Sequence, residues 1–133
     1  MKNEDVIRAV LLSWSQGHDA IAAAMHEHFT SDCVLEQIGV PTTTGPDEAV
    51  ELFRGLGAMG LRGIDVEYRN VVCAGDVVCT ERVDHLVRPD GSRAASSAVV
   101  GVTEFRNGKI SSWREYYDPA VLADVGYSAS SEV

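Results

Sequence analysis

Two short stretches place charged side chains inside otherwise apolar runs. Residues 80–84 read TERVD and residues 113–118 read WREYYD. Side chains alternate between faces along an extended strand, so Arg82 and Asp84 point the same way. If this face and the one carrying Glu115 both turn inward, an arginine and two carboxylates meet. Carboxylates held close together tend to keep one proton between them, so such a site could carry out acid and base chemistry at once.

The same spacing also fits an interpretation without a functional site, in which Arg82 and Asp84 form a solvent-exposed ion pair that contributes little to stability. The polarity of the residues does not decide which face is inward, because Glu81 and His85 on the opposite face could equally be covered. An inward arrangement would place the charged cluster beneath Trp113 and Tyr117, which share the Glu115 face and are candidates to contact water or substrate. The elements around these stretches therefore have to be considered.

Helical patterns occupy the first half of the chain. Apolar residues at helical spacing, helix-favouring alanines and a proline followed by acidic residues predict three helices, over residues 4–14, residues 19–28, and from Pro46 to Gly57 or Gly60. Residues 31–41 between the second and third helix are predicted to be extended. The first half thus supplies helices and one early strand.

The pattern changes to period two after Gly63. Turn signals at residues 74–76, 88–92 and 106–109 separate runs rich in β-branched residues, which predicts four successive antiparallel strands. Helices followed by a meander predict an α+β fold with helices covering one face of a strongly curved sheet. A polar tail from Asp118 is expected to fray.

Bulk composition limits the classes of function. The chain has 133 residues, 45% hydrophobic and 23% charged, which fits one domain over residues 1–133. A net charge of −9 without a basic patch argues against nucleic acid as a partner. No run approaches the roughly 20 apolar residues of a membrane span, and charges stand where a signal peptide needs an apolar region, so we expect a cytoplasmic protein.

The cysteines and histidines lack the spacing of metal ligands. Three cysteines, Cys33, Cys73 and Cys79, are expected to be buried free thiols rather than disulfides. The histidines, His18, His26, His28 and His85, do not form a ligand set. We therefore predict no metal site.

Nearly the whole chain resembles the limonene-1,2-epoxide hydrolase family, small enzymes with the cone-shaped fold of nuclear transport factor 2 and SnoaL-like proteins. The resemblance is carried by VIRAVLLSW, SDCVLEQIGVP, GPDEAV, TERVDHL and GVTEFRNGKISSWREYYD, of which TERVD and GKISSWREYYD are the most specific. It implies N-terminal helices on a curved, mostly antiparallel mixed sheet. It also implies a homodimer through the outer face of the sheet.

The resemblance implies roles for individual residues. Asp84 would protonate the oxygen of an apolar epoxide, Glu115 would act as base on water in place of the family's aspartate, and Arg82 would orient both. This reaction yields a vicinal diol and requires no cofactor. The family holds its water with a tyrosine and an asparagine, and the matching positions here are Leu35 and Gln37. Tyr117 is a candidate substitute for the tyrosine.

Other functions remain open on the sequence. The loss of the tyrosine at Leu35 is compatible with an epoxide-opening cyclase, in which a substrate hydroxyl replaces water. A ketosteroid-isomerase-like enzyme or polyketide cyclase would need a carbanion base and oxyanion donors, which an arginine beside the aspartate fits poorly. A non-catalytic small-molecule binding module could use the same cone as a pocket.

Overall fold

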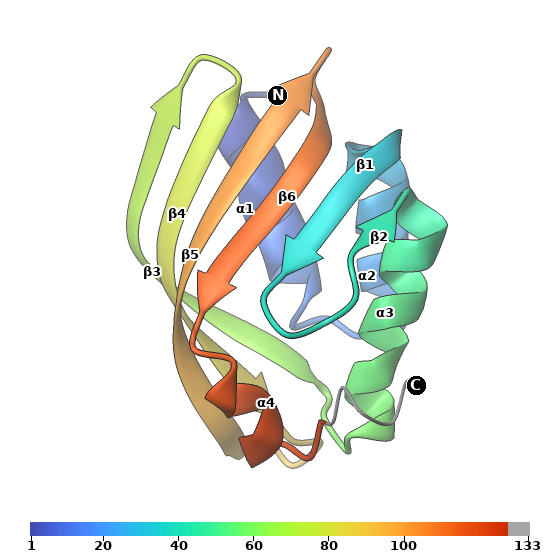
Figure 1. Ribbon diagram of the computed structural model, residues 1–133, viewed down its shortest axis with the longest axis vertical. Helices are drawn as coiled ribbons and strands as arrows, with labels where there is room; N and C mark the ends of the chain where they lie inside the picture. Colours follow the sequence, from blue (N-terminus) through green and yellow to red (C-terminus); the bar gives the residue numbers. More distant parts are fainter. Residues whose placement is uncertain (128–133) are drawn as a thin grey trace.

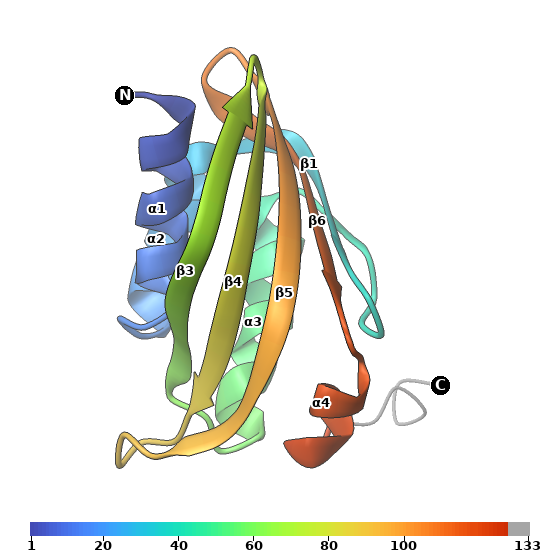
Figure 2. The same ribbon diagram turned by 90° about the vertical axis from the view of Figure 1, so that its left-hand side faces the viewer.

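A helical layer packs against the inner face of a long, curved sheet in the computed structural model, which describes residues 1–127 (Figure 1). This layer consists of α1 (Asn3–Ser13), α2 (His18–His28) and α3 (Pro46–Ala58). The predicted helices are confirmed, with ends displaced by one or two residues. Figure 2 shows α1 alongside β3 and α3 behind β4 and β5.

The helices follow their apolar spacing. In α1, Val6 and Val10 are buried with Trp14, the residue that caps the helix, so that spacings of four place all three on the core face. In α3, Pro46 opens the first turn, where its fixed φ is favourable, and Asp47 and Glu48 lie near the positive end of the helix dipole.

The sheet contains six strands in the order β2-β1-β6-β5-β4-β3. The strands are β1 (Phe29–Gln37), β2 (Thr43–Thr44), β3 (Gly63–Ala74), β4 (Val77–Val87), β5 (Arg93–Arg106) and β6 (Lys109–Tyr117). Strands β3 to β6 form the predicted antiparallel meander, and β1 joins β6 in parallel. The mixed, curved sheet confirms the predicted fold class, whereas the short strand β2 was not predicted.

All three predicted turns of the meander are present. Gly75 and Gly91 adopt positive φ in the first two. In the third, Asn107 and Gly108 both have positive φ, which is the requirement of the tightest hairpin turns. Because these turns fix the register of the strands, they also fix which side chains meet across the sheet.

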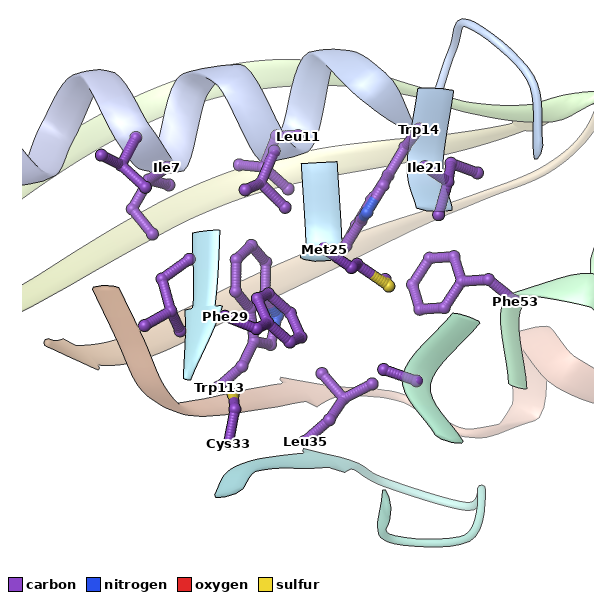
Figure 3. Close-up of a cluster of buried hydrophobic side chains, with 14 of the residues drawn as sticks. Ile7, Leu11, Trp14, Ile21, Met25, Phe29, Cys33, Leu35, Phe53 and Trp113 are labelled. Carbon is purple, nitrogen blue, oxygen red and sulfur yellow. The ribbon is translucent and has the colours of Figure 1, made fainter. Parts of the chain in front are cut away.

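Aromatic side chains from helices and strands fill the core (Figure 3). Trp14 packs with Phe53 and with Trp113 at ring-centroid distances of 5.1 and 5.6 Å, and Phe29 lies 6.1 Å from Trp113. Leu35 is buried in the same cluster. This packing fastens the helical layer to the inner face of the sheet.

Two expectations from the sequence need correction. Cys33 is buried and Cys79 half-buried, but Cys73 is exposed; all three are free thiols. The tail predicted to fray from Asp118 instead forms a short helix, α4 (Ala120–Asp124), whose Val121 is buried against the protein. Residues 128–133 of that tail lie outside the described part of the chain.

Helices long and apolar enough to cross a membrane are not found among residues 1–127.

Candidate active site

Arg82 lies at the centre of a buried charged cluster. Its Nε donates to Asp84 Oδ1 at 3.0 Å and its Nη2 to Asp84 Oδ2 at 2.9 Å, while Nη1 donates to Thr80 Oγ1 at 3.0 Å. Nη2 also donates to Glu115 Oε2. Arg82 is 1% exposed, so the guanidinium has exchanged its water for two carboxylates and a hydroxyl.

Strand alternation places these groups together. Thr80, Arg82 and Asp84 all face the interior from β4, and Glu115 faces it from β6. Strand β5 lies between β4 and β6, so Arg82 must extend across it to reach Glu115. The inward interpretation of both stretches is therefore the one that the structure adopts.

Gly101 on β5 leaves room for this crossing. It pairs with Thr80 on one side and Glu115 on the other. A Cβ atom on residue 101 would lie 2.8 Å from Arg82 Nη1 and 2.9 Å from Thr80 Oγ1. The sequence analysis did not single out this residue, although a glycine inside an apolar strand signals close approach by another group.

Gln37 reaches the cluster from β1. The parallel pairing of β1 and β6 sets Gln37 opposite Glu115, and its Nε2 donates to Glu115 Oε1 at 2.6 Å. Both oxygens of Glu115 thus have a donor, one from Gln37 and one from Arg82. The Oε1 atom of Gln37 remains available as an acceptor beside the carboxylate.

The electrostatics favour one retained proton. Burial raises the pKa of Asp84; Arg82 opposes this rise, and the nearby Glu115 adds to it. Burial disfavours the charge on Arg82 as well, yet Glu115 and Asp84 together raise the pKa of the guanidinium. One positive charge compensates only one of two buried carboxylates, which favours the protonated form of Asp84.

A cavity of about 330 Å³ opens onto this cluster. Asp84, Glu115 and Gln37 contribute polar groups to its wall. Much of the remaining wall is apolar and comes from α3, the inner face of the sheet and the C-terminal segment, as with Leu52, Leu56, Met59, Leu86, Val121 and Leu122. A few polar groups converging in an apolar pocket are typical of a small-molecule site.

Two residues predicted to contact water or substrate do not line this cavity. Leu35 and Trp113 are each 1% exposed and belong to the hydrophobic core. Trp113 shares the inward face with Glu115, but it lies two residues earlier on β6, where Phe29 and Trp14 cover it. The sequence pattern predicted that Trp113 and Glu115 share a face, but it carried no information about where along the strand the cavity begins.

Tyr117 does line the cavity, two residues beyond Glu115 on the same face of β6. Burial raises the pKa of Tyr117 to about 12, with Glu115, Tyr127 and Asp84 adding to the effect. Its hydroxyl is therefore neutral at physiological pH and able to donate a hydrogen bond into the cavity.

The C-terminal segment forms a wall that the sequence analysis missed. Val121, Leu122 and Tyr127 line the cavity. Gly39 has a φ of +86°, which favours glycine, and a Cβ atom there would lie 2.9 Å from Leu122 Cδ1, so α4 packs closely against the turn after β1. The apolar pair Val121-Leu122 after a proline was the one available sequence signal.

This arrangement supplies a carboxyl group whose pKa is raised, a carboxylate paired with a guanidinium, and an apolar space beside both. Among residues 1–127, no three His, Cys, Asp or Glu side chains gather in a way that could hold a metal ion. The site can thus donate one proton and accept another on neighbouring atoms of a ligand.

Residues 2–125 match the limonene-1,2-epoxide hydrolase catalytic domain. Epoxide hydrolase EphG of Mycobacterium tuberculosis is 30% identical over 104 residues, which are 78% of this chain and 64% of that protein. The chain thus spans somewhat less than two thirds of the length of this relative.

Solved structures give the same fold. An LEH-like epoxide hydrolase from M. tuberculosis is 25% identical, with a TM-score of 0.72 over 91% of this chain and 86% of the other. An NTF2-like protein of unknown function from Burkholderia pseudomallei has a TM-score of 0.78 at 15% identity, covering 96% and 100% of the two chains. A putative polyketide cyclase from Streptomyces antibioticus, IdmH, has a TM-score of 0.73 at 17% identity, covering 96% and 100%.

The last two structures share the NTF2-like fold alone, whereas the match over residues 2–125 includes the strands that carry Arg82, Asp84 and Glu115. The chain belongs to the limonene-1,2-epoxide hydrolase family.

Proposed function

We propose that this protein is an epoxide hydrolase that adds water to an apolar epoxide in one acid- and base-catalysed step. The observation that carries the proposal is the placement of Arg82 between two buried carboxylates, at the wall of an apolar cavity. Opening an unactivated epoxide requires a proton on the oxygen and a nucleophile at carbon. Asp84 and Glu115 fit these two tasks.

In the proposed step Glu115 takes a proton from a water molecule as the water oxygen bonds to one epoxide carbon. The bond from that carbon to the epoxide oxygen breaks, and its electron pair stays on the oxygen. Asp84 gives its proton to that oxygen, so a neutral vicinal diol forms. The proton on Glu115 then has to return to Asp84, and Arg82, bonded to both carboxylates, stabilises whichever is ionised.

The cavity indicates the kind of substrate. Its apolar walls favour a hydrocarbon body, and the polar groups lie on one side of it. The volume of about 330 Å³ is within the range of drug-sized pockets. We infer an epoxide on a predominantly hydrocarbon skeleton, with its oxygen directed at Asp84.

Turnover tests this function directly. Wild-type enzyme incubated with a panel of cyclic and acyclic hydrocarbon epoxides should release vicinal diols, measured by chiral gas chromatography. The variant Asp84→Asn serves as the matched control, because it keeps the shape of the side chain but has no acidic proton. Wild-type rates indistinguishable from this variant across the panel would overturn the proposal.

An epoxide-opening cyclase is the second candidate, and Leu35 is the observation that favours it. Strand β1 offers Gln37 as a polar contact for water near Glu115, while Leu35 on the same strand is buried in the core. A substrate carrying its own hydroxyl would need less help in placing the nucleophile. A hydroxy-epoxide distinguishes the two, because a cyclase returns a cyclic ether.

We also propose that two copies associate through the outer face of the sheet. Val100 and Tyr116 are paired neighbours on this face of β5 and β6, and they are 44% and 50% exposed. Light scattering of the wild type and of Val100→Lys should report a dimer and a monomer, respectively. A monomeric wild type would contradict this association.

A further inference from the structure

Ser97 on β5 lies directly opposite Asp84 in the pairing of β4 with β5. Residues opposite each other in an antiparallel pair point to the same face of the sheet, with Cβ atoms about 4.5–5.5 Å apart. Both residues line the cavity. Strand β5 lies between β4 and β6, so Ser97 is on the side of Asp84 that faces the strand of Glu115 (Figure 1). A hydroxyl group therefore lies beside the proposed proton donor.

The other neighbours of Asp84 on this face offer nothing to an oxygen in the cavity. Along β4 they are Arg82 and Leu86, and opposite Asp84 on β3 is Val66. Leu86 and Val66 are apolar, and Arg82 is buried behind the cavity wall without contributing to it. Among the four neighbours, Ser97 is thus the one that can present a hydrogen-bond donor to a ligand.

The hydroxyl of Ser97 is only weakly held by the protein. Its Oγ donates to the carbonyl oxygen of the next residue, Ala98, at 3.2 Å, which is long for a hydroxyl donor. The preceding serine, Ser96, is held more closely, with its Oγ 2.7 Å from His85 Nδ1 on the opposite face of the sheet. A hydroxyl proton can rotate, so Ser97 loses little by donating to a ligand instead.

We propose that the Ser97 hydroxyl donates a hydrogen bond to the epoxide oxygen as a second donor beside Asp84, an inference that rests on the proposed hydrolase function. An epoxide oxygen has two lone pairs. One takes the proton of Asp84, and the other accepts from Ser97 Oγ. As the C–O bond breaks, its electron pair stays on this oxygen. Ser97 keeps its own proton and stabilises the developing negative charge.

A second donor is useful because of how Asp84 holds its proton. Burial raises the pKa of Asp84, so this proton is given up less readily than that of an ordinary carboxyl group. Negative charge therefore builds on the epoxide oxygen before proton transfer is complete. A donor already in place stabilises that charge in the transition state more than it stabilises the bound substrate, so Ser97 should affect kcat more than KM.

Ser111 on β6 provides a matched control. Its Oγ also donates to a backbone carbonyl oxygen, that of Glu104, at the same distance of 3.2 Å, and both serines are half-buried. The residues that line the cavity include Ser97 but not Ser111. Alanine at either position removes one long hydrogen bond within the sheet, whereas alanine at position 97 also removes a hydroxyl from the site.

Kinetics of Ser97→Ala and Ser111→Ala test the proposal, with the epoxide of the hydrocarbon panel that the wild type opens fastest. Ser97→Ala should lower kcat roughly 10- to 100-fold with little change in KM. Ser111→Ala should keep a kcat near that of the wild type, and the thermal midpoints of the two variants should be similar. Equal kcat values for the two variants would overturn the role of Ser97.

Ser97→Thr separates the lost donor from altered packing. Threonine keeps a hydroxyl on the same carbon, and its β-branched side chain suits a strand. This variant should therefore recover part of the kcat that Ser97→Ala loses. A loss that Ser97→Thr does not recover at all would indicate a packing effect and would also overturn the proposal.

A crystal structure with trans-cyclohexane-1,2-diol tests the contact in the wild type. One hydroxyl oxygen of this probe corresponds to the epoxide oxygen, and the other corresponds to the attacking water. The first should lie within about 3.2 Å of both Ser97 Oγ and an oxygen of Asp84, with the second beside Glu115 and Gln37. A diol oxygen bonded to Asp84 but beyond hydrogen-bond distance of Ser97 would contradict the inference.

The two proposals fail in different ways. Diol formation by the wild type, together with equal rates for the two alanine variants, refutes the Ser97 donor and leaves the hydrolase. A wild type that opens no epoxide refutes the hydrolase and, with it, donation to an epoxide oxygen. A diol held by Asp84 and Ser97 in that case would leave the serine only as a ligand contact in the cavity.

Discussion

Arg82 on β4 contacts Glu115 on β6 across the strand that separates them. The crossing is possible because the intervening residue on β5, Gly101, has no side chain at the point where the guanidinium passes. The charged cluster therefore depends on a position that carries no chemistry of its own. This dependence leads to the first prediction.

Gly101→Ala should displace Arg82 from Glu115. The added Cβ would lie 2.8 Å from Arg82 Nη1, closer than real Cβ contacts. Overpacking of this kind costs about 1–3 kcal/mol of stability. We expect a lower thermal midpoint and a loss of turnover of about 10²-fold, because the guanidinium no longer orients both carboxylates.

The control for this substitution is Gly57→Ala in α3. A Cβ atom there meets nothing within 4 Å, and alanine favours a helix. This variant should keep its activity and gain slightly in thermal midpoint. Wild-type turnover by Gly101→Ala would show that Arg82 need not bridge the two carboxylates.

Asp84→Asn should abolish turnover without unfolding the protein. The amide keeps the shape of the carboxyl group but cannot give a proton to an epoxide oxygen. Steady-state rates and circular dichroism on the same preparation separate chemistry from folding. Retained activity would remove Asp84 as the proton donor, and loss of the fold would instead make it a structural residue.

The same variant should reveal the cost of burying the Asp84 charge. Burial raises the pKa of Asp84 above its ordinary value of 3.8, so the folded state binds this proton more tightly than the unfolded state does. The stability that Asp84 contributes is complete below pH 3.8 and is lost as pH rises through the raised pKa. The thermal midpoint of Asp84→Asn relative to wild type should therefore increase from acid to neutral pH. A difference independent of pH would contradict a raised pKa.

Local rules determine part of the convergence of Arg82, Asp84 and Glu115, but they left open which face of the strands turns inward. Alternation sets which residues share a face, and the turn around Asn107 and Gly108 fixes the register of the last hairpin. The pairing of Gln37 with Glu115 is not local, since β1 meets β6 only in the folded sheet. The family resemblance implied a role for Gln37 in holding water, but nothing in the sequence predicted its contact with Glu115.

The sequence patterns could not predict which inward-facing residues of a strand reach the cavity. They also could not predict that the C-terminal segment lines it. Leu35 and Trp113 face the same way as the site residues, but helices and aromatic rings cover them, and periodicity carries no information about such cover. The helix α4 is too short to show a helical period. It packs against Gly39 and against apolar residues such as Leu61 and Leu86, which are distant from it in sequence.

Substitutions at Glu115 should distinguish the effect of the carboxylate on kcat from the effect of side-chain length. Glu115→Gln removes the base and should lower kcat about 10²-fold or more. Glu115→Asp keeps a carboxylate but withdraws it by one methylene from Gln37 and Arg82, so it should keep part of the rate. Both variants are to be measured on one substrate, with thermal midpoints alongside. A rate for Glu115→Gln equal to that of the wild type would eliminate Glu115 from the mechanism.

Heavy-oxygen water should label the diol and leave the protein unlabelled. Both oxygens of Asp84 accept hydrogen bonds from Arg82, and those of Glu115 accept from Gln37 and Arg82. A hydrogen bond to each of these oxygens makes it a weaker nucleophile, so water rather than a side chain should attack. One turnover by stoichiometric enzyme, followed by mass spectrometry of the diol and of the peptides carrying Asp84 and Glu115, measures where the label goes.

Label in either peptide would instead reveal an ester intermediate, because water would then attack the carboxyl carbon and leave its oxygen on the protein. A hydroxy-epoxide run in the same water extends the test to the cyclase. A hydrolase returns a labelled triol from it, whereas a cyclase returns an unlabelled cyclic ether, since the substrate's own hydroxyl forms the new bond. We expect the labelled product because Gln37, which contacts Glu115, has a free acceptor in its Oε1 atom. A water molecule that gives one proton to Glu115 has a second proton for this acceptor. A substrate hydroxyl that gives its single proton to Glu115 has none left.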